Sequence, residues 1–171
     1  IALAYLALNG DQYLIAALSV VTAGSTLGFL VWNKSPAKIY MGDAGALFLG
    51  VLLATLTVRF EPTAQTQMGS FLIPVFLLAI PILDTTVAVL SRIRRHLSPF
   101  QGGQDHLSHR LIRSGLSRKI SAIILWSLSG LFAGVSVLLP NASQSFTKYL
   151  LIGAGLTWLV LLIAFFRTKD I

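Results

Sequence analysis

Four long apolar runs limit what this chain can fold into. They cover residues 13–32, 69–91, 120–139 and 148–166, and each is close to the roughly 20 residues that a helix needs to cross a bilayer. Hydrophobic residues make up 55% of the chain, charged residues only 11%, and the mean hydropathy is +0.79. A chain this apolar is unlike an ordinary soluble domain. The sequence therefore predicts an all-α, polytopic integral membrane bundle.

Two shorter segments complete a predicted bundle of about six helices. Residues 45–60 form an apolar run of about 16 residues, which can span a bilayer that thins locally or whose flanking side chains snorkel. Residues 1–8 are expected to be the incomplete end of another helix. The chain starts without the features of a secretory signal, so we expect residues 1–171 to be one membrane domain of a longer chain. Cysteine is absent, which excludes disulfides and thiolate metal sites.

The basic residues fall mainly on one side of the predicted membrane. If each run crosses once, seven basic residues between 92 and 119, two between 33 and 44, and two after residue 166 share a side. These are eleven of the 13 basic residues, and only Arg59 and Lys148 lie on the other side. By the positive-inside tendency, we place the long loop 92–119 in the cytoplasm. Membrane topology thus explains the net charge of +7, and we expect no nucleic-acid partner because no nucleic-acid motif is present.

An acidic residue, Asp43, directly precedes the apolar run 45–60 on the cytoplasmic side. Its carboxylate can cap a helix or favour the positive end of the helix dipole. Alternatively, it holds a hard cation such as Mg²⁺, which takes oxygen ligands and keeps waters and substrate phosphates as the rest of its shell. The nearby Lys34 and Lys38 suit phosphates, but they equally suit anionic lipid headgroups. The residues alone leave these alternatives open.

Two histidines and an arginine form a second polar group in the loop 92–119. His106, His109 and Arg110 have the spacing of one helical face, which offers donors to an anion. Gly102 and Gly103 before them predict a mobile stretch. A zinc site is disfavoured because no third ligand is nearby. The remaining alternative is a basic interfacial helix attracted to lipid headgroups.

A second acidic residue, Asp84, is predicted to lie within the span 69–91. An ionised carboxylate in hydrocarbon costs several kcal/mol unless it is paired or hydrated. We therefore expect Asp84 to be a functional site, to bond a neighbouring helix, or to pair with an arginine that reaches back.

These residues lie in motifs that resemble those of the polyprenyl-phosphate N-acetylhexosamine-1-phosphate transferases, a family of bacterial multi-pass enzymes. The resemblance covers most of residues 1–120 and looks like the C-terminal half of such an enzyme. It rests on Asn33-x-x-Pro36-Ala37-Lys38-Ile39-Tyr40-Met41-Gly42-Asp43-x-Gly45, on Pro81-x-x-Asp84-Thr85 followed by Arg92, and on Asp105-His106-x-x-His109-Arg110-Leu111 followed by Gly115-Leu116-Ser117. Two positions depart from the family pattern: Ser108 stands where the family has histidine, and Ala46 where it has serine.

The resemblance implies transfer of a sugar 1-phosphate, with N-acetylglucosamine 1-phosphate as the first expectation, from a UDP-sugar to polyprenyl phosphate with release of UMP. It implies Mg²⁺ at Asp43, with Mn²⁺ as an alternative ion, and UDP-sugar binding by Asn33, His106, His109 and Arg110. It also implies a bacterial plasma (inner) membrane location, a cytoplasmic active face, and a role in cell-wall or surface-polysaccharide synthesis. A homodimer is compatible with the sequence.

The family's upstream acidic motifs have no match in residues 1–32. We therefore expect the main catalytic acids to precede this chain, and we expect the chain alone to be inactive. Two other functions stay open. Half of a membrane transporter would also carry an intramembrane acid such as Asp84, and a non-catalytic assembly subunit would use the basic face to bind lipid.

Overall fold

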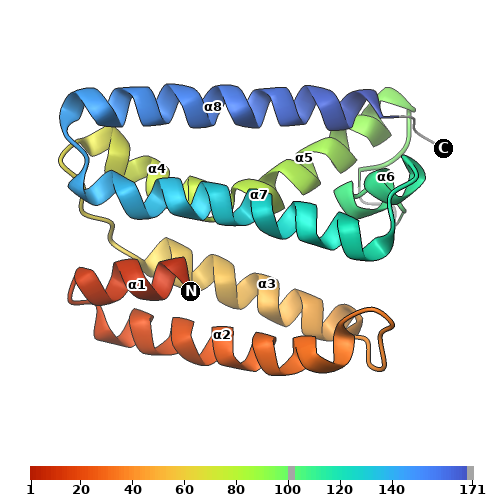
Figure 1. The fold of residues 1–171 in the computed structure, drawn as a ribbon, viewed down its shortest axis with the longest axis horizontal. Helices are drawn as coiled ribbons and strands as arrows, with labels where there is room; N and C mark the ends of the chain where they lie inside the picture. The colour runs from red at the N-terminus through yellow and green to blue at the C-terminus, as the bar shows by residue number, and fades with distance from the viewer. Residues whose placement is uncertain (100–102, 169–171) are drawn as a thin grey trace. The chain divides into compact units, whose positions relative to one another are not determined.

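The computed structural model describes residues 1–99 and 103–168, and these residues form helices and no β-strand (Figure 1). The all-α prediction is confirmed. Two residues used in the predictions lie outside the described residues: Gly102 of the predicted mobile stretch, and Lys169, one of the two basic residues after residue 166. The chain divides into two compact units, Ile1–Leu77 with Ala133–Gln144, and Leu78–Phe132 with Ser145–Ile171.

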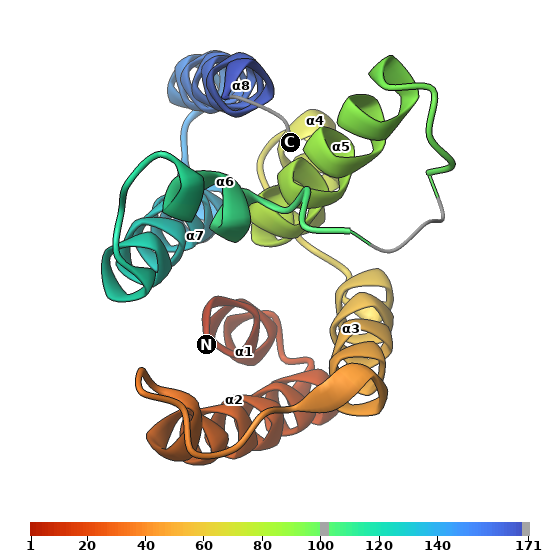
Figure 2. The same cartoon turned by 90° about the vertical axis from the view of Figure 1, so that its right-hand side faces the viewer.

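The first unit contains α1 (Ala2–Asn9), α2 (Tyr13–Asn33), α3 (Gly42–Arg59), α4 (Gln67–Leu77), the end of α7 and the 3₁₀ helix η1 (Leu139–Asn141). Helix α1 packs alongside α2 (Figure 2), and α4 contacts η1. Burial of apolar side chains holds these elements together, and Ala7, Ile73 and Leu139 are fully buried. The loop between α2 and α3 leads to Asp43, which lies in the first turn of α3.

The second unit contains α5 (Ala79–Arg94), α6 (Leu107–Arg113), the first part of α7 (Arg118–Leu138) and most of α8 (Gln144–Arg167). Its buried apolar side chains include Leu83, Val87, Leu107 and Phe132. The indole Nε1 of Trp158 donates to the Ala79 carbonyl at 3.0 Å. This bond joins the middle of α8 to the first residue of α5.

The run predicted as one span over residues 69–91 is divided into α4 and α5, with a break at Leu78. Pro81 explains the break, because it has no N–H to donate to the Leu77 carbonyl and its ring would clash with that carbonyl in a continuous helix. Within α5, Pro81 falls in the first turn, where a missing N–H is tolerated. The sequence prediction followed hydropathy and missed this effect of the proline.

Four of the described helical segments are long and apolar enough to cross a membrane: α2, α3, α7 continued through η1 (Arg118–Asn141), and α8. The broken pair of α4 and α5 makes a fifth candidate if it is counted as one span. Many large apolar side chains on these helices are exposed, among them Phe48 at 69% and Val160 at 64%, as lipid-facing positions require. The protein is therefore a multi-pass helical membrane protein. Helix α3 has 18 residues, which supports counting 45–60 as a span.

Candidate functional site

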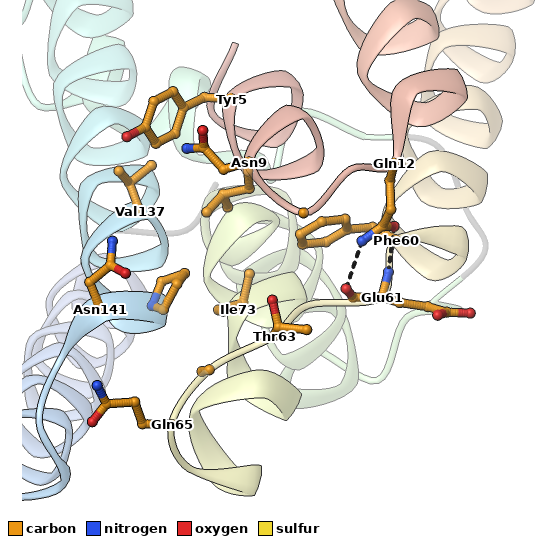
Figure 3. A pocket seen from close by; sticks show the side chains of 14 residues that line it. Tyr5, Asn9, Gln12, Phe60, Glu61, Thr63, Gln65, Ile73, Val137 and Asn141 are labelled. Carbon is orange, nitrogen blue, oxygen red and sulfur yellow. Dashed lines mark hydrogen bonds between the residues drawn. The ribbon is translucent and has the colours of Figure 1, made fainter.

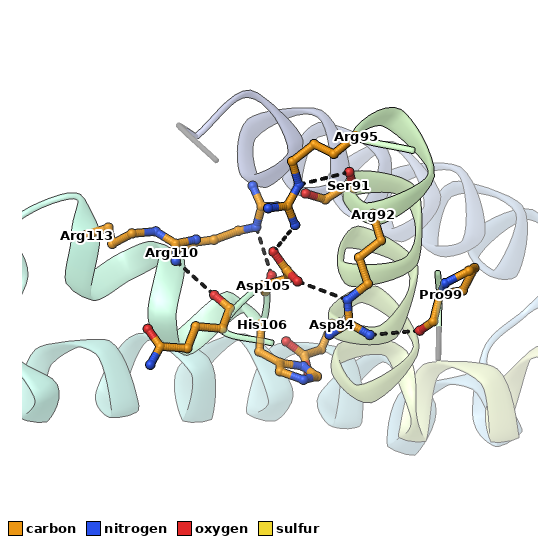
Figure 4. A network of polar contacts seen from close by, with 10 residues as sticks. Asp84, Ser91, Arg92, Arg95, Pro99, Asp105, His106, Arg110 and Arg113 are labelled. Carbon is orange, nitrogen blue, oxygen red and sulfur yellow. Dashed lines mark hydrogen bonds and ion pairs between the residues drawn. The ribbon is translucent and has the colours of Figure 1, made fainter. Parts of the chain in front are cut away.

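Asp84 on α5 reaches the start of α6 and binds it with both carboxylate oxygens (Figure 4). His106 Nδ1 lies 2.7 Å from Asp84 Oδ2, and the Leu107 N–H donates to Asp84 Oδ1 at 2.6 Å. His106 is the residue directly before α6. The partners of Asp84 are thus a histidine and a backbone N–H, and not the arginine that the sequence also allowed.

The two histidines of the predicted substrate group differ in their surroundings. The hydrogen bond to Asp84 raises the pKa of His106 above its ordinary value and outweighs the burial that would lower it. The His106 side chain is still 47% exposed, so its ring can contact a ligand. His109 lies half-buried on α6 and makes no hydrogen bond to another described residue. Both rings are therefore available as donors to an anion.

Asp105, the residue before His106, is held by two arginines from the end of α5 (Figure 4). Arg92 Nε donates to Asp105 Oδ2 at 2.9 Å, and Arg95 pairs with Oδ1. Burial alone would raise the pKa of Asp105, but the hydrogen bond from Arg92 and the charge of Arg95 hold it below its ordinary value. The carboxylate is therefore ionised at neutral pH and fixes the histidine segment to α5.

Gly103 lies against this ion pair. A Cβ at position 103 would sit 2.8 Å from Asp105 Oδ2 and 3.6 Å from Arg92 Nη2. Any larger residue here would push against an oxygen that Arg92 already holds. The prediction of a mobile stretch falls partly on residues outside the described ranges, but its second glycine has this close-packing role.

Arg110 does not have the surroundings of a residue that contacts substrate. Its side chain is fully buried, at 0% exposed. Nε donates to the Asp105 carbonyl at 3.0 Å, and Nη1 donates to the carbonyls of Phe165 and Thr168, both at 3.0 Å. Arg110 thus differs from His106 and His109 in its surroundings, although the three residues share a motif.

Asp43 lies in the first turn of α3, in the first unit. It is not the helix cap that the sequence allowed, because the N-cap residue is Met41 and no side chain caps the helix. Gly42 before it has a φ of +69°, a left-handed conformation that favours glycine. The Asp43 side chain is exposed and makes no hydrogen bond or ion pair with another described residue. Its carboxylate therefore remains open to an external partner.

Asn33, the last residue of α2, closes the loop that leads to Asp43. Its Nδ2 donates to the Ile39 carbonyl at 2.9 Å, and the Lys38 N–H donates to the Trp32 carbonyl at 2.8 Å. The Lys38 ammonium also lies over the Trp32 ring, 5.5 Å from its centroid. These contacts shape the loop, and the Asn33 side-chain oxygen makes no hydrogen bond to another described residue. The motif around Asn33 therefore has at least a structural role.

The described residues offer no group of three or more histidine, cysteine, aspartate or glutamate side chains that could hold a metal ion. A zinc-type site is therefore not built within residues 1–99 and 103–168. Asp43 nevertheless fits Mg²⁺ as a single ligand, because its unpartnered carboxylate supplies hard oxygen and Mg²⁺ is commonly held by one or two carboxylates plus phosphates and water.

The first unit also contains a polar cavity of about 600 Å³ (Figure 3). Amide side chains of Asn9, Gln12, Gln65 and Asn141 help to line it. Gln12 binds the backbone of Glu61 at both ends of its amide, at 2.7 and 3.0 Å. The cavity includes none of the predicted site residues, and the predicted topology puts its loops on the side opposite the basic loops.

Comparison with known proteins assigns the family. The profile described as glycosyl transferase family 4 matches residues 1–61. A probable undecaprenyl-phosphate N-acetylglucosaminyl 1-phosphate transferase of Bacillus subtilis (strain 168) is 38% identical over 141 residues, which are 82% of this chain and 39% of that protein. A decaprenyl-phosphate N-acetylglucosaminephosphotransferase of Mycobacterium leprae is 35% identical over 177 residues, covering 95% of this chain and 44% of that protein. The chain belongs to the polyprenyl-phosphate N-acetylhexosamine-1-phosphate transferase family.

The similarity to this transferase family extends to a phospho-N-acetylmuramoyl-pentapeptide-transferase of Mycolicibacterium vanbaalenii, 31% identical over 129 residues that are 75% of this chain and 34% of that protein. The chain thus spans about two fifths of the length of the first relatives, at 39% and 44%. No solved structure matches the chain.

Sequence reasoning about this transferase family missed the role of Asp105 and of the arginines at the end of α5. The available signal was the spacing of Arg92 and Arg95, which puts both on one helical face, together with an acid directly before the first histidine. Hydropathy and motif matching do not detect the ion pairs of Asp105 with Arg92 and Arg95, because the partners are 13 and 10 residues apart across a loop.

Proposed function

We propose that the full-length protein transfers N-acetylglucosamine 1-phosphate from a UDP-sugar to a polyprenyl phosphate and releases UMP. The observation that carries this proposal is the similarity of 82% and 95% of the chain to two relatives named as transferases of this kind. The chain spans less than half of each relative, so the remaining parts of the site lie in the rest of the full-length protein.

The proposed reaction exchanges one phosphoryl bond for another. A phosphate oxygen of the polyprenyl phosphate bonds to the sugar-linked phosphorus of the UDP-sugar, and the bond from that phosphorus to the bridging oxygen breaks. The electron pair leaves with that oxygen on UMP. Such a transfer depends on positioning and on charge stabilisation around the moving phosphoryl group, which His106 and His109 can supply as hydrogen-bond donors to the diphosphate.

His106 is prepared for this role by its partner. Asp84 holds the Nδ1 side of the ring at 2.7 Å, and the raised pKa of His106 favours the imidazolium form. The other ring nitrogen, Nε2, would then donate to a phosphate oxygen of the substrate. Ser108 lacks the ring that the family has at this position, so the donors of His106 and His109 gain importance in this chain.

Asp43 would hold Mg²⁺, with Mn²⁺ as an alternative because both favour carboxylate oxygen. When bound, the ion would neutralise negative charge on the phosphates. The exposed and unpartnered carboxylate supports this role for Asp43, and the bond from Asn33 to Ile39 would fix the loop that presents it. The Asn33 side-chain oxygen is proposed to accept a hydrogen bond from the UDP-sugar.

We place this activity at the cytoplasmic face of a bacterial plasma membrane, where a UDP-sugar is available, and in the synthesis of cell-wall or surface polysaccharide. The distribution of the basic residues supports this orientation. The apolar helices would supply the lipid environment in which the polyprenyl phosphate resides.

The test is product formation by the purified full-length protein. With UDP-N-acetylglucosamine, undecaprenyl phosphate and Mg²⁺, we expect one UMP for each lipid-linked sugar diphosphate formed. Omission of the lipid should abolish UMP release. UMP release without the lipid, or no product from a protein that is folded and contains all its segments, would contradict the proposal.

A further inference from the structure

Binding of a substrate diphosphate would not explain why the Arg110 side chain is buried. A guanidinium that binds substrate must reach solvent, yet Arg110 is 0% exposed. Its guanidinium donates to three backbone carbonyls, those of Asp105, Phe165 and Thr168. Two of these acceptors lie at the C-terminal end of α8, 55 and 58 residues further along the chain.

We propose that Arg110 is a positioning residue, which ties α6 to the C-terminal end of α8 and thereby fixes His106 and His109; this role rests on the proposed transferase function. The last carbonyls of a helix have no partner within the helix and carry partial negative charge. Arg110 places a buried cation against this end, where it donates to the Phe165 carbonyl in the last turn of α8 and to the Thr168 carbonyl just after the helix. Arg110 therefore stabilises the end of α8 and uses it as a fixed support for α6.

The same guanidinium also joins this support to α5. Its Nε donates to the Asp105 carbonyl, while the Asp105 carboxylate binds Arg92 and Arg95. Asp105 and Arg110 directly adjoin His106 and His109 in the sequence. A shift of Arg110 would therefore move both histidines, even though Arg110 itself does not touch the substrate.

The substitution Arg110→Lys distinguishes a direct contact with the diphosphate from the tie to α8. A phosphate accepts a lysine ammonium as a point charge, so a direct diphosphate contact would survive in part in Arg110→Lys. The tie to α8 depends on the planar fork of a guanidinium, whose donors reach carbonyls on two different segments at once. A single ammonium cannot reproduce that arrangement, so Arg110→Lys should behave like Arg110→Gln.

The first experiment measures amide hydrogen exchange in the full-length protein in detergent. In Arg110→Lys and in Arg110→Gln, we expect exchange to accelerate roughly tenfold or more in α6 and in the last turn of α8. Arg118→Lys is the control, because Arg118 is exposed at the start of α7 and makes no hydrogen bond to another described residue. It should leave both segments unchanged. Unchanged exchange in Arg110→Lys would overturn the proposal.

The second experiment is a double-mutant comparison of turnover. Arg110→Lys alone should lower turnover roughly 10-fold to 100-fold, because small misplacements of substrate-binding groups are costly. In a His109→Ala background the same change should cost clearly less, since Arg110 acts through the histidines. Equal losses in both backgrounds would indicate an independent contact with substrate and would overturn the proposal.

Two further outcomes remain decisive. If neither Arg110 variant folds, exchange in the unmodified protein decides: α6 and the last turn of α8 should show similar protection, and much faster exchange of either would contradict the tie. If the unmodified protein releases no UMP, the proposed function fails, while the exchange comparison still tests the role of Arg110.

Discussion

Asp84 and His106 are 22 positions apart in the sequence, and their side chains meet at 2.7 Å. The pair explains how an acid in a predicted membrane span is tolerated, because an unpaired carboxylate there would cost several kcal/mol. It also explains why a histidine directly precedes α6. Neither residue could be assigned its partner from spacing, since the loop that joins them sets the distance.

The Asp84–His106 pair should make stability depend on pH. Because the folded-state pKa of His106 is raised, the pair contributes fully below the ordinary histidine pKa, and this contribution is lost as the pH rises through the raised pKa. We expect the difference in Tm between the unmodified full-length protein and His106→Gln to shrink as the pH rises from about 6 to about 9.

Asp84→Asn is the matched control for this prediction, because it removes the charge on the other side of the pair. It should reduce the pH dependence of Tm as His106→Gln does. A Tm difference that stays constant across the pH range would show that the charge of His106 contributes nothing to the folded state.

At the scale of elements, the break at Leu78 lets α5 begin as a separate helix, and α5 and its end carry Asp84, Arg92 and Arg95. These side chains bind the segment that contains Asp105 and His106. A hydrogen bond joins α8 to the start of α5: the indole N–H of Trp158 donates to the Ala79 carbonyl at 3.0 Å. Cross-helix hydrogen bonds of this kind are worth about 0.6 kcal/mol on average in membrane proteins. Trp158 is therefore more than an apolar, lipid-facing side chain.

Trp158→Phe should lower Tm by a small but measurable amount, since phenylalanine keeps an aromatic ring and loses the donor. Trp126→Phe is the matched control, because Trp126 is 56% exposed on α7 and makes no hydrogen bond to another described residue. Thermal unfolding of both variants in detergent checks the prediction. Equal decreases in Tm for the two variants would mean that the loss of ring volume, and not the loss of the hydrogen bond, causes the destabilisation.

Hydropathy predicted the helices well, because length and apolar content alone determine whether a segment can cross a bilayer. It placed α2, α3, α7 and α8 to within a few residues. It failed at Leu78, where the missing N–H of Pro81 outweighs the apolar run. It could not foresee α6 as a support for the histidines, since α6 is held by Asp84 and Arg110 and not by its own hydropathy.

At the scale of the whole molecule, orientation in the membrane decides whether the candidate site can meet a UDP-sugar. Single cysteines at Ser35 and Ser117 should be protected from an impermeant thiol reagent in intact cells, and one at Gln65 should react. All three positions are exposed on loops or turns, so a failure to react would reflect the side of the membrane. Other cysteines of the full-length protein are replaced first. Reaction at Ser117 from outside would contradict the cytoplasmic assignment.

The site residues were predictable only in part for a further reason. The motif resemblance identified Asn33, Asp43, His106, His109 and Arg110 together, because it reads residue types and order. It could not distinguish an open carboxylate such as Asp43 from a buried guanidinium such as Arg110, because burial is decided by segments far along the chain. The end of α8, which encloses Arg110, matches the family only as a generic apolar helix in the sequence.

The most direct test of the central claim, that this chain carries part of a Mg²⁺-dependent transferase site, is the turnover of Asp43→Asn in the full-length protein. Asparagine keeps the size of the side chain and removes its charge, and Asp43 makes no contact in the structure whose loss would unfold the protein. We predict an unchanged Tm and a loss of UMP release on the order of 10² or more, the scale for deleting one electrostatic stabiliser of a transition state. A folded Asp43→Asn protein with near-normal turnover and unchanged dependence on Mg²⁺ would contradict the account.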